Sequence, residues 1–171
     1  GAGRRRSRTL GSATTQFLYD GLNPVQELAS GTPTANLLTG LWIDEYFTRS
    51  DAAGARHFLT DALRSTIALT DGFGTVQTEY TYEPFGTVTA AGAGSGNMFG
   101  FTGREADATG LNYYRARYYD PKLQRFVSED PLGLQDGPNP HLFVRNDPIN
   151  LTDPLGLEIV LFGRVPFIPR G

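Results

Sequence analysis

The chain has 171 residues, a formal net charge of −3, no cysteine and two histidines, His57 and His141. The lack of Cys excludes thiol nucleophiles, disulfides and Cys-based zinc sites. The acidic balance gives no reason to expect a nucleic-acid partner, and no stretch approaches the ~20 apolar residues of a membrane span. We therefore expect no cofactor, no metal, no nucleic acid and no membrane span.

Composition favours a β-sheet protein over packed helices. The 21 glycines and 11 prolines supply many turn formers, and much of the 39% hydrophobic content is aromatic or β-branched. Such side chains suit pleated, half-buried surfaces. The predicted fold class is all-β, and the chain is expected to be a piece of a larger repetitive protein, as Gly1 at its start also suggests.

Residues 1–16 are predicted to form a basic, glycine-rich tail. The cluster Arg4-Arg5-Arg6-Ser7-Arg8 has glycine on both sides and no apolar run behind it. This pattern excludes a signal peptide and is typical of a solvated tail, with a binding arm as the alternative.

Residues 17–100 repeat a strand, a turn led by Asp and a returning strand. The turn motifs recur at intervals of about fifty residues, as Tyr19-Asp20-Gly21, Thr70-Asp71-Gly72 and Tyr119-Asp120-Pro121. Asp accepts hydrogen bonds from its own backbone two residues on, and Gly adopts positive φ at no steric cost. The repeats predict β-hairpins.

Between the turns, alternation of side chains predicts individual strands. Residues 76–82 alternate with period two, which gives one packed face and one wet face. Residues 113–119 also alternate, so we expect one strand whose arginines stack on neighbouring tyrosines; a nucleic-acid reader is the alternative. Residues 60–69 are compatible with a short helix, and residues 90–96 with a small-residue loop.

From Leu37 onward the sequence resembles the Rhs (YD-repeat) family, specifically its C-terminal core-associated region. The resemblance rests on these segments: Leu41-Trp42-Ile43-Asp44-Glu45-Tyr46-Phe47, Phe58-Leu59-Thr60-Asp61-Ala62, Tyr80-Thr81-Tyr82-Glu83-Pro84-Phe85-Gly86, Phe101-Thr102-Gly103-Arg104-Glu105, the run from Gly110 to Pro121, and the run from Arg125 to Leu134.

The resemblance implies an architecture and a setting. YD repeats of this family wind into a hollow β-sheet shell, or cocoon, that encloses a toxic C-terminal domain. Residues 101–157 would form the inward-coiled plug of the shell, and residues 158–171 the stub of a variable C-terminal region. The implied partners are the rest of the protein's own shell, a C-terminal toxin domain and components of a secretion system. The implied location is secreted or cell-surface associated, in a bacterium.

Two copies of one pentapeptide carry the candidate chemistry. Asp-Pro-Leu-Gly-Leu occurs at residues 130–134 and again at 153–157, with eighteen residues between the copies. Turn formation explains the residue types, because Asp, Pro and Gly occupy their preferred turn positions. A second interpretation is that the two turns hold Asp130 and Asp153 side by side, so that one carboxyl keeps a proton while the other activates water.

The pair of pentapeptides matches the autoproteolysis motif of the Rhs family, in which cleavage follows the Leu of the second copy. This resemblance implies that Asp130 and Asp153 are catalytic and that Leu157 and Glu158 flank the scissile bond. The chain would then be an aspartyl autoprotease that releases its own effector. Two alternatives stay open: a structural or adhesive YD-repeat module that never cuts itself, and an orphan tip without a toxin.

Overall fold

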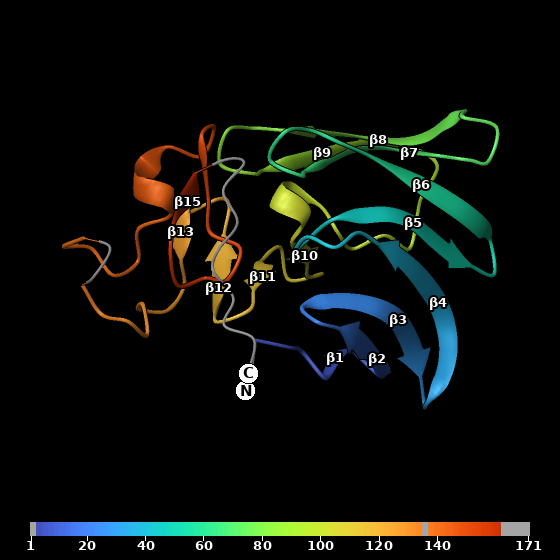
Figure 1. Cartoon of the computed structure of the whole chain (residues 1–171), viewed down its shortest axis with the longest axis horizontal. Coiled ribbons are helices and arrows are strands. Elements are labelled where there is room, and N and C mark those ends of the chain that lie inside the picture. Colours follow the sequence, from blue (N-terminus) through green and yellow to red (C-terminus); the bar gives the residue numbers. More distant parts are fainter. Residues whose placement is uncertain (1–2, 135–136, 162–171) are drawn as a thin grey trace.

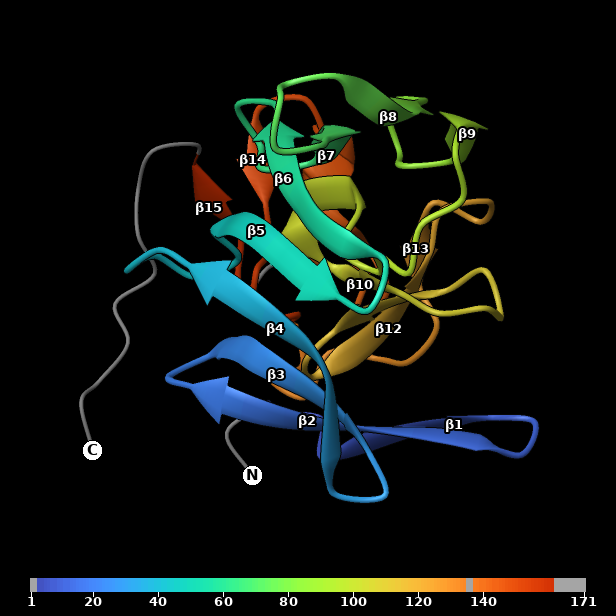
Figure 2. The same ribbon diagram turned by 90° about the vertical axis from the view of Figure 1, so that its right-hand side faces the viewer.

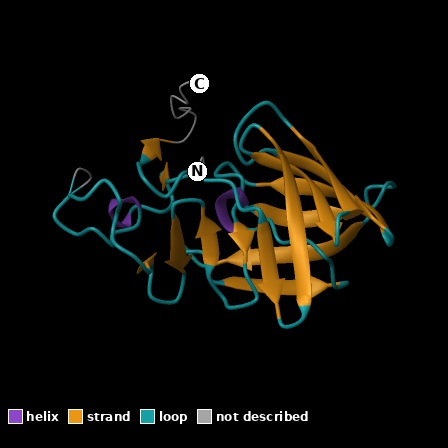
Figure 3. Ribbon diagram, turned by 90° about the horizontal axis from the view of Figure 1, so that it is seen from below, coloured by secondary structure: helices purple, strands orange, loops and turns teal. Residues whose placement is uncertain are grey.

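The computed structural model describes residues 3–134 and 137–161 as an all-β protein in two parts (Figure 1). A large sheet comes first, and a compact C-terminal region with a four-stranded sheet follows. Viewed from below, the large sheet forms a curved wall and the C-terminal region lies beside its open end (Figure 3). The predicted all-β hairpin fold is confirmed.

The large sheet is an antiparallel meander in which each strand pairs with the next along the chain. It bends so that its first and last strands lie at opposite ends of a curve (Figure 2). Its strands are β1 (Ser7–Leu10), β2 (Ala13–Asp20), β3 (Asn23–Ala29), β4 (Thr32–Thr39), β5 (Tyr46–Asp51), β6 (Gly54–Thr60), β7 (Thr66–Thr70), β8 (Val76–Tyr82) and β9 (Val88–Gly92).

The hairpin turns follow the chemistry predicted for them. The β2–β3 turn pairs Asp20 with Asn23 and places Gly21 at φ +58°. In the next motif, Asp71 Oδ1 accepts hydrogen bonds from the backbone N–H groups of Phe73 and Thr75, at 2.9 and 3.0 Å. A carboxylate that satisfies two turn amides specifies a tight reversal, so local sequence sets the register of the meander.

The C-terminal region contains short strands joined by turns and two 3₁₀ turns. Its four-stranded sheet follows chain order and pairs Tyr113 with Tyr118 in its central hairpin. The elements are η1 (Phe101–Gly103), β10 (Glu105–Ala106), β11 (Asn112–Tyr114), β12 (Arg117–Asp120), β13 (Arg125–Phe126), η2 (Val144–Asn146), β14 (Leu151–Thr152) and β15 (Val160–Leu161).

Two apolar clusters form the core. The first is built mainly from residues of the large sheet and consists of Phe17, Leu37, Tyr46, Phe58, Leu69, Met98 and Phe99. The second belongs to the C-terminal region and consists of Phe101, Tyr114, Tyr119, Phe126, Phe143 and Val144. Its rings meet mostly edge to face, as Tyr114 does with Phe143 at a centroid distance of 5.5 Å, which is a favoured aromatic geometry.

The prediction that residues 1–16 form a solvated tail is wrong for those residues of this range that the structure describes. β1 and half of β2 lie within residues 1–16, and Arg5 is buried. The Arg5 guanidinium pairs with Asp107 at 2.7 Å and lies over the Tyr113 ring, 4.1 Å from its centroid. A run of arginines in a sequence suggests a segment exposed to solvent. In the folded chain, however, buried carboxylates far along the sequence pair with one of these arginines, Arg5.

Three local predictions are also wrong. Residues 60–69 form no helix: they hold the end of β6, a turn, and most of β7. Part of the predicted loop at 90–96 continues β9, because the cross-strand bonds of β8 extend to Gly92. Residues 113–119 form a hairpin and not one strand, since Arg115 takes a left-handed φ of +57° between β11 and β12.

Candidate functional site

The two Asp-Pro-Leu-Gly-Leu segments adopt the same local turn. In each, the Gly N–H donates to the carbonyl of the Asp three residues earlier, at 2.9 Å for Gly133 and 3.3 Å for Gly156. Both glycines have positive φ, +74° and +67°. Turn chemistry therefore accounts for the conformation of each copy, and what the carboxylates can do depends on where the turns lie.

Arg117 of β12 joins the two carboxylates. Its Nη2 lies 2.9 Å from Asp130 Oδ2 and 3.1 Å from Asp153 Oδ2, and all three side chains are nearly inaccessible to solvent. Because these two contacts share one nitrogen, the two oxygens are at most about 6 Å apart. The structure thus brings the two predicted aspartates together, with a guanidinium between them in place of a directly shared proton.

Asp153 is the more deeply buried acid, with 2% of its surface exposed. Burial raises the pKa of its carboxyl to about 6, against hydrogen bonds from backbone N–H groups and the charge of Arg117, which lower it. A buried carboxyl with a pKa near neutrality can hold a proton and also release it, as a general acid or base must.

Asp153 also contacts the peptide bond at which cleavage is predicted. Its Oδ1 accepts hydrogen bonds from the N–H groups of Leu157, at 3.0 Å, and Glu158, at 3.2 Å. The Glu158 nitrogen belongs to the Leu157–Glu158 peptide bond. The N–H of this bond thus points at Asp153, whose carboxyl lies within hydrogen-bond reach of the nitrogen that would leave.

A small cavity lies beside the two aspartates. Its volume is about 10 Å³, roughly the space that one water molecule needs. Arg117, Asp130, Asn139, Arg145, Asp153 and Ile159 are among its lining residues. Ile159 is the second residue after the predicted scissile bond, so the cavity is lined by both acids and by a residue close to that bond.

The β11–β12 turn holds the second pentapeptide by three consecutive hydrogen bonds. The Arg115 guanidinium donates to the Pro154 carbonyl, the Ala116 N–H to Leu155 O at 3.1 Å, and Arg117 Nε to Gly156 O at 2.7 Å. A Cβ on Gly156 would lie 2.2 Å from the Tyr114 carbonyl oxygen, so only glycine permits this approach.

Sequence reasoning missed Arg117. We expected the Arg117 side chain to stack on tyrosines along the face of one strand. No turn signal in the sequence marks the chain reversal that brings Arg117 into contact with Asp153. One general signal could have found it, because two carboxylates buried together need a cation. The run from Gly110 to Pro121, which precedes the first pentapeptide, contains two arginines. Arg117 is further fixed over the Phe126 ring, 3.6 Å from its centroid.

Among residues 3–134 and 137–161, no group of three or more His, Cys, Asp or Glu side chains is arranged to hold a metal ion. Within the same ranges, no helix has both the length and the apolar character required to cross a membrane.

Comparison with known proteins finds bacterial toxins. Toxin subunit YenC1 of Yersinia entomophaga is 42% identical over 100 residues, which is 56% of this chain and 10% of that protein. Double-stranded DNA deaminase toxin A of Burkholderia cenocepacia is 31% identical over 89% of this chain and 12% of its own length. No protein-family model matches the sequence.

Solved structures of Tc toxin components also superpose on this chain. A Photorhabdus luminescens Tc holotoxin pore superposes with a TM-score of 0.73 at 26% identity, over 97% of this chain and 9% of that one. The TcdB2–TccC3 crystal structure gives 0.68 at 27% identity, over 88% and 8%. This chain thus spans about a tenth of the proteins it matches. Its homologues are Tc toxin subunits and related toxins, which support an Rhs-type (YD-repeat) shell family.

Proposed function

We propose that this chain is the C-terminal shell and plug segment of a secreted bacterial toxin of the Rhs type. We also propose that it cuts its own backbone after Leu157. In the proposed architecture, residues 17–100 are YD-repeat wall, 101–157 the plug and 158–171 the start of the released region. Residues 162–171 lie outside the described part of the chain. The observation that carries the proposal is the hydrogen bond between Asp153 and the Leu157–Glu158 amide.

The roles of the two acids follow from their surroundings. Asp130 accepts a proton from a water molecule, and the oxygen of that water attacks the Leu157 carbonyl carbon. Asp153, whose pKa burial raises to about 6, then donates a proton to the Glu158 nitrogen as the C–N bond breaks. The products are a carboxyl group on Leu157 and an amine on Glu158, and Arg117 holds both aspartates in place throughout.

The partners that we propose for this chain follow from the proteins to which it is similar. TccC3 appears in complexes with TcdB2, and several relatives are named as toxins. By analogy, we propose that this segment adjoins the rest of its own shell and a C-terminal effector, and that the protein reaches its target through secretion components.

Mass spectrometry of the full-length chain tests the cleavage. We expect a break between Leu157 and Glu158 in the wild type, and an uncut chain for Asp153→Asn and Asp130→Asn. Asp120→Asn is the matched control, because Asp120 also precedes a proline and caps its own turn, at Lys122 N, but has no contact with Arg117 among its hydrogen bonds. An uncut wild type would favour the structural YD-repeat module.

The pH dependence of the cleavage rate gives a second test. Only protonated Asp153 can donate to the leaving nitrogen, and its pKa is about 6. We therefore expect the rate to fall as the pH rises above about 6, approaching tenfold per pH unit. A rate that stays constant from pH 6 to 8 would contradict the role given to Asp153.

A further inference from the structure

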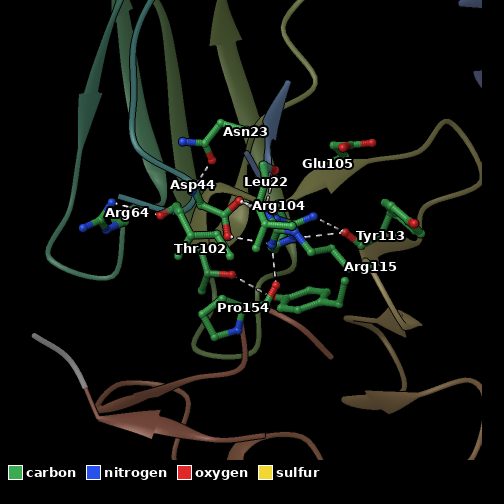
Figure 4. Close-up of polar contacts among 12 residues, drawn as sticks. Leu22, Asn23, Asp44, Arg64, Thr102, Arg104, Glu105, Tyr113, Arg115 and Pro154 are labelled. Atoms are coloured by element: carbon green, nitrogen blue, oxygen red, sulfur yellow. Dashed lines mark hydrogen bonds and ion pairs between the residues drawn. The ribbon is translucent and has the colours of Figure 1, made fainter. Parts of the chain in front are cut away.

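A buried ion cluster joins the second pentapeptide to the large sheet. At its centre is Asp44, which lies between β4 and β5 and is 3% exposed. Arg104 and Arg115 both pair with its carboxylate, and Figure 4 shows Arg115 reaching from Asp44 to Pro154. The two guanidinium groups hold the pKa of the Asp44 carboxyl below its usual value despite complete burial, so the cluster is ionised.

Arg115 uses its guanidinium to connect three segments. It donates to Asp44 Oδ1 at 2.7 Å and to Asp44 Oδ2 at 3.0 Å. It also donates to the Leu22 carbonyl in the β2–β3 turn, at 3.1 Å, and to the Pro154 carbonyl next to Asp153. The planar donor fork of arginine suits such simultaneous contacts.

Asp44 is itself fixed by the large sheet. Its N–H donates to Asn23 Oδ1 at 2.8 Å, and the Asn23 amide donates to Trp42 O at 2.7 Å. A Cβ on Gly103 would lie 2.9 Å from Asp44 Cβ, which shows how closely the C-terminal region packs on it. Asp44 has φ +61°, a conformation that Asp and Asn tolerate better than most residues.

We infer that the Asp44–Arg115 pair is a positioning device that makes self-cleavage depend on the docking of the large sheet against the C-terminal region. The inference rests on the proposed function and adds its regulation. If the β2–β3 turn and the Asp44 loop are undocked, Arg115 loses its anchors, and the Pro154 carbonyl loses its side-chain donor. The turn that presents Asp153 to the Leu157–Glu158 bond then keeps only its hydrogen bonds with Ala116 and Arg117, and small misplacements of reacting groups are costly.

The test compares self-cleavage rates of folded full-length variants. We expect Arg115→Met to slow cleavage at least about tenfold, as for lost orientation of a reacting group, and Arg115→Lys to recover part of the rate. Arg49→Met is the matched control, because Arg49 is an arginine with a largely buried side chain that pairs with Glu27 and Asp51, both in the large sheet. It should cleave within about twofold of the wild-type rate.

A second variant covers the case in which Arg115→Met fails to fold. Asp44→Asn keeps the size and the left-handed backbone of Asp44 and removes its charge, so it should also slow cleavage while Arg49→Met does not. Equal slowing by Arg49→Met, or a wild-type rate in folded Arg115→Met or Asp44→Asn, would overturn the inference.

Hydrogen exchange supplies a readout that general destabilisation does not mimic. In an uncleaved Asp130→Asn background, Arg115→Met should raise exchange at the Leu157 and Glu158 amides, which donate to Asp153, and leave the amides of β5 and β6 unchanged. Unchanged protection at both amides would refute positioning by Arg115. A wild-type chain that is never cut would refute the proposed function as well, whereas a cut chain insensitive to Arg115 would refute this inference alone.

Discussion

The large sheet and the C-terminal region are stabilised in different ways. In the sheet, each strand pairs with its sequence neighbour, and turns such as that of Asp71 need only local hydrogen bonds. In the C-terminal region, charged groups meet over long separations, as Arg115 meets Asp44 across 71 residues and Arg117 meets Asp153 across 36. The comparison teaches that the sheet relies mainly on pairing between neighbouring strands, with the Arg49–Glu27 ion pair as an addition, whereas the site relies on buried ion pairs between distant segments.

The largest expected effect is at the centre of the site. Arg117→Met would leave two nearly inaccessible carboxylates without their shared cation. Removing one partner of a buried ion pair typically costs about 3–5 kcal/mol, so we expect such a loss of unfolding free energy and no self-cleavage. Denaturant unfolding measures the loss. Full stability of the Arg117→Met variant would break the contrast between the two regions.

The two pentapeptide glycines should respond unequally. Gly156→Ala places a Cβ 2.2 Å from the Tyr114 carbonyl, whereas a Cβ on Gly133 meets nothing within 4 Å. Both carry the strain of positive φ, about 1–2 kcal/mol for a residue with a side chain. We expect Gly133→Ala to cost about that much and Gly156→Ala about twice as much. Equal losses in thermal unfolding would show that the β11–β12 turn does not hold the second copy.

Protonation of Asp153 should make stability depend on pH. Its folded pKa of about 6 lies above its ordinary value of 3.8. The stability from its neutral form is therefore present below about pH 4 and lost as the pH rises through 6, by about 2 kcal/mol between pH 4.5 and 8. The Asp153→Asn variant should not show this loss of stability with rising pH, because an amide side chain does not titrate.

Urea unfolding in an uncleaved Asp130→Asn background measures this difference. The change in stability caused by adding Asp153→Asn should be more favourable at pH 8 than at pH 4.5. The depressed pKa of Asp44 affects both proteins equally, so it cancels in the difference. A difference that does not vary with pH would mean that burial leaves the Asp153 pKa unshifted.

The smallest effect is expected at a hairpin tip of the large sheet. Phe73, between β7 and β8, is 97% exposed, and exposed substitutions usually change stability by less than about 0.5 kcal/mol. Phe73→Ala should leave thermal unfolding and self-cleavage unchanged. A large loss of stability would mean that this turn is more than a local reversal.

Much of the fold could be predicted from local patterns. The range 76–82 was predicted from alternation alone and is β8 as the structure has it. The Asp-led turns were predicted because their hydrogen bonds form within a few residues. The prediction for residues 113–119 failed because Arg115, which has a left-handed φ, carries no turn signal, and its guanidinium is held by Asp44 from far away in the chain.

By itself, the sequence determined the all-β class, the Asp-led hairpin turns and the shape of both Asp-Pro turns, because these depend on side chains and backbone groups a few residues apart. Tertiary structure alone decided that Arg5 is buried, that Arg117 lies between Asp130 and Asp153, and that Arg115 ties Pro154 to Asp44. Ion pairs in a low-dielectric interior depend on which charges the folded chain brings together, and residue spacing along the chain does not encode that proximity.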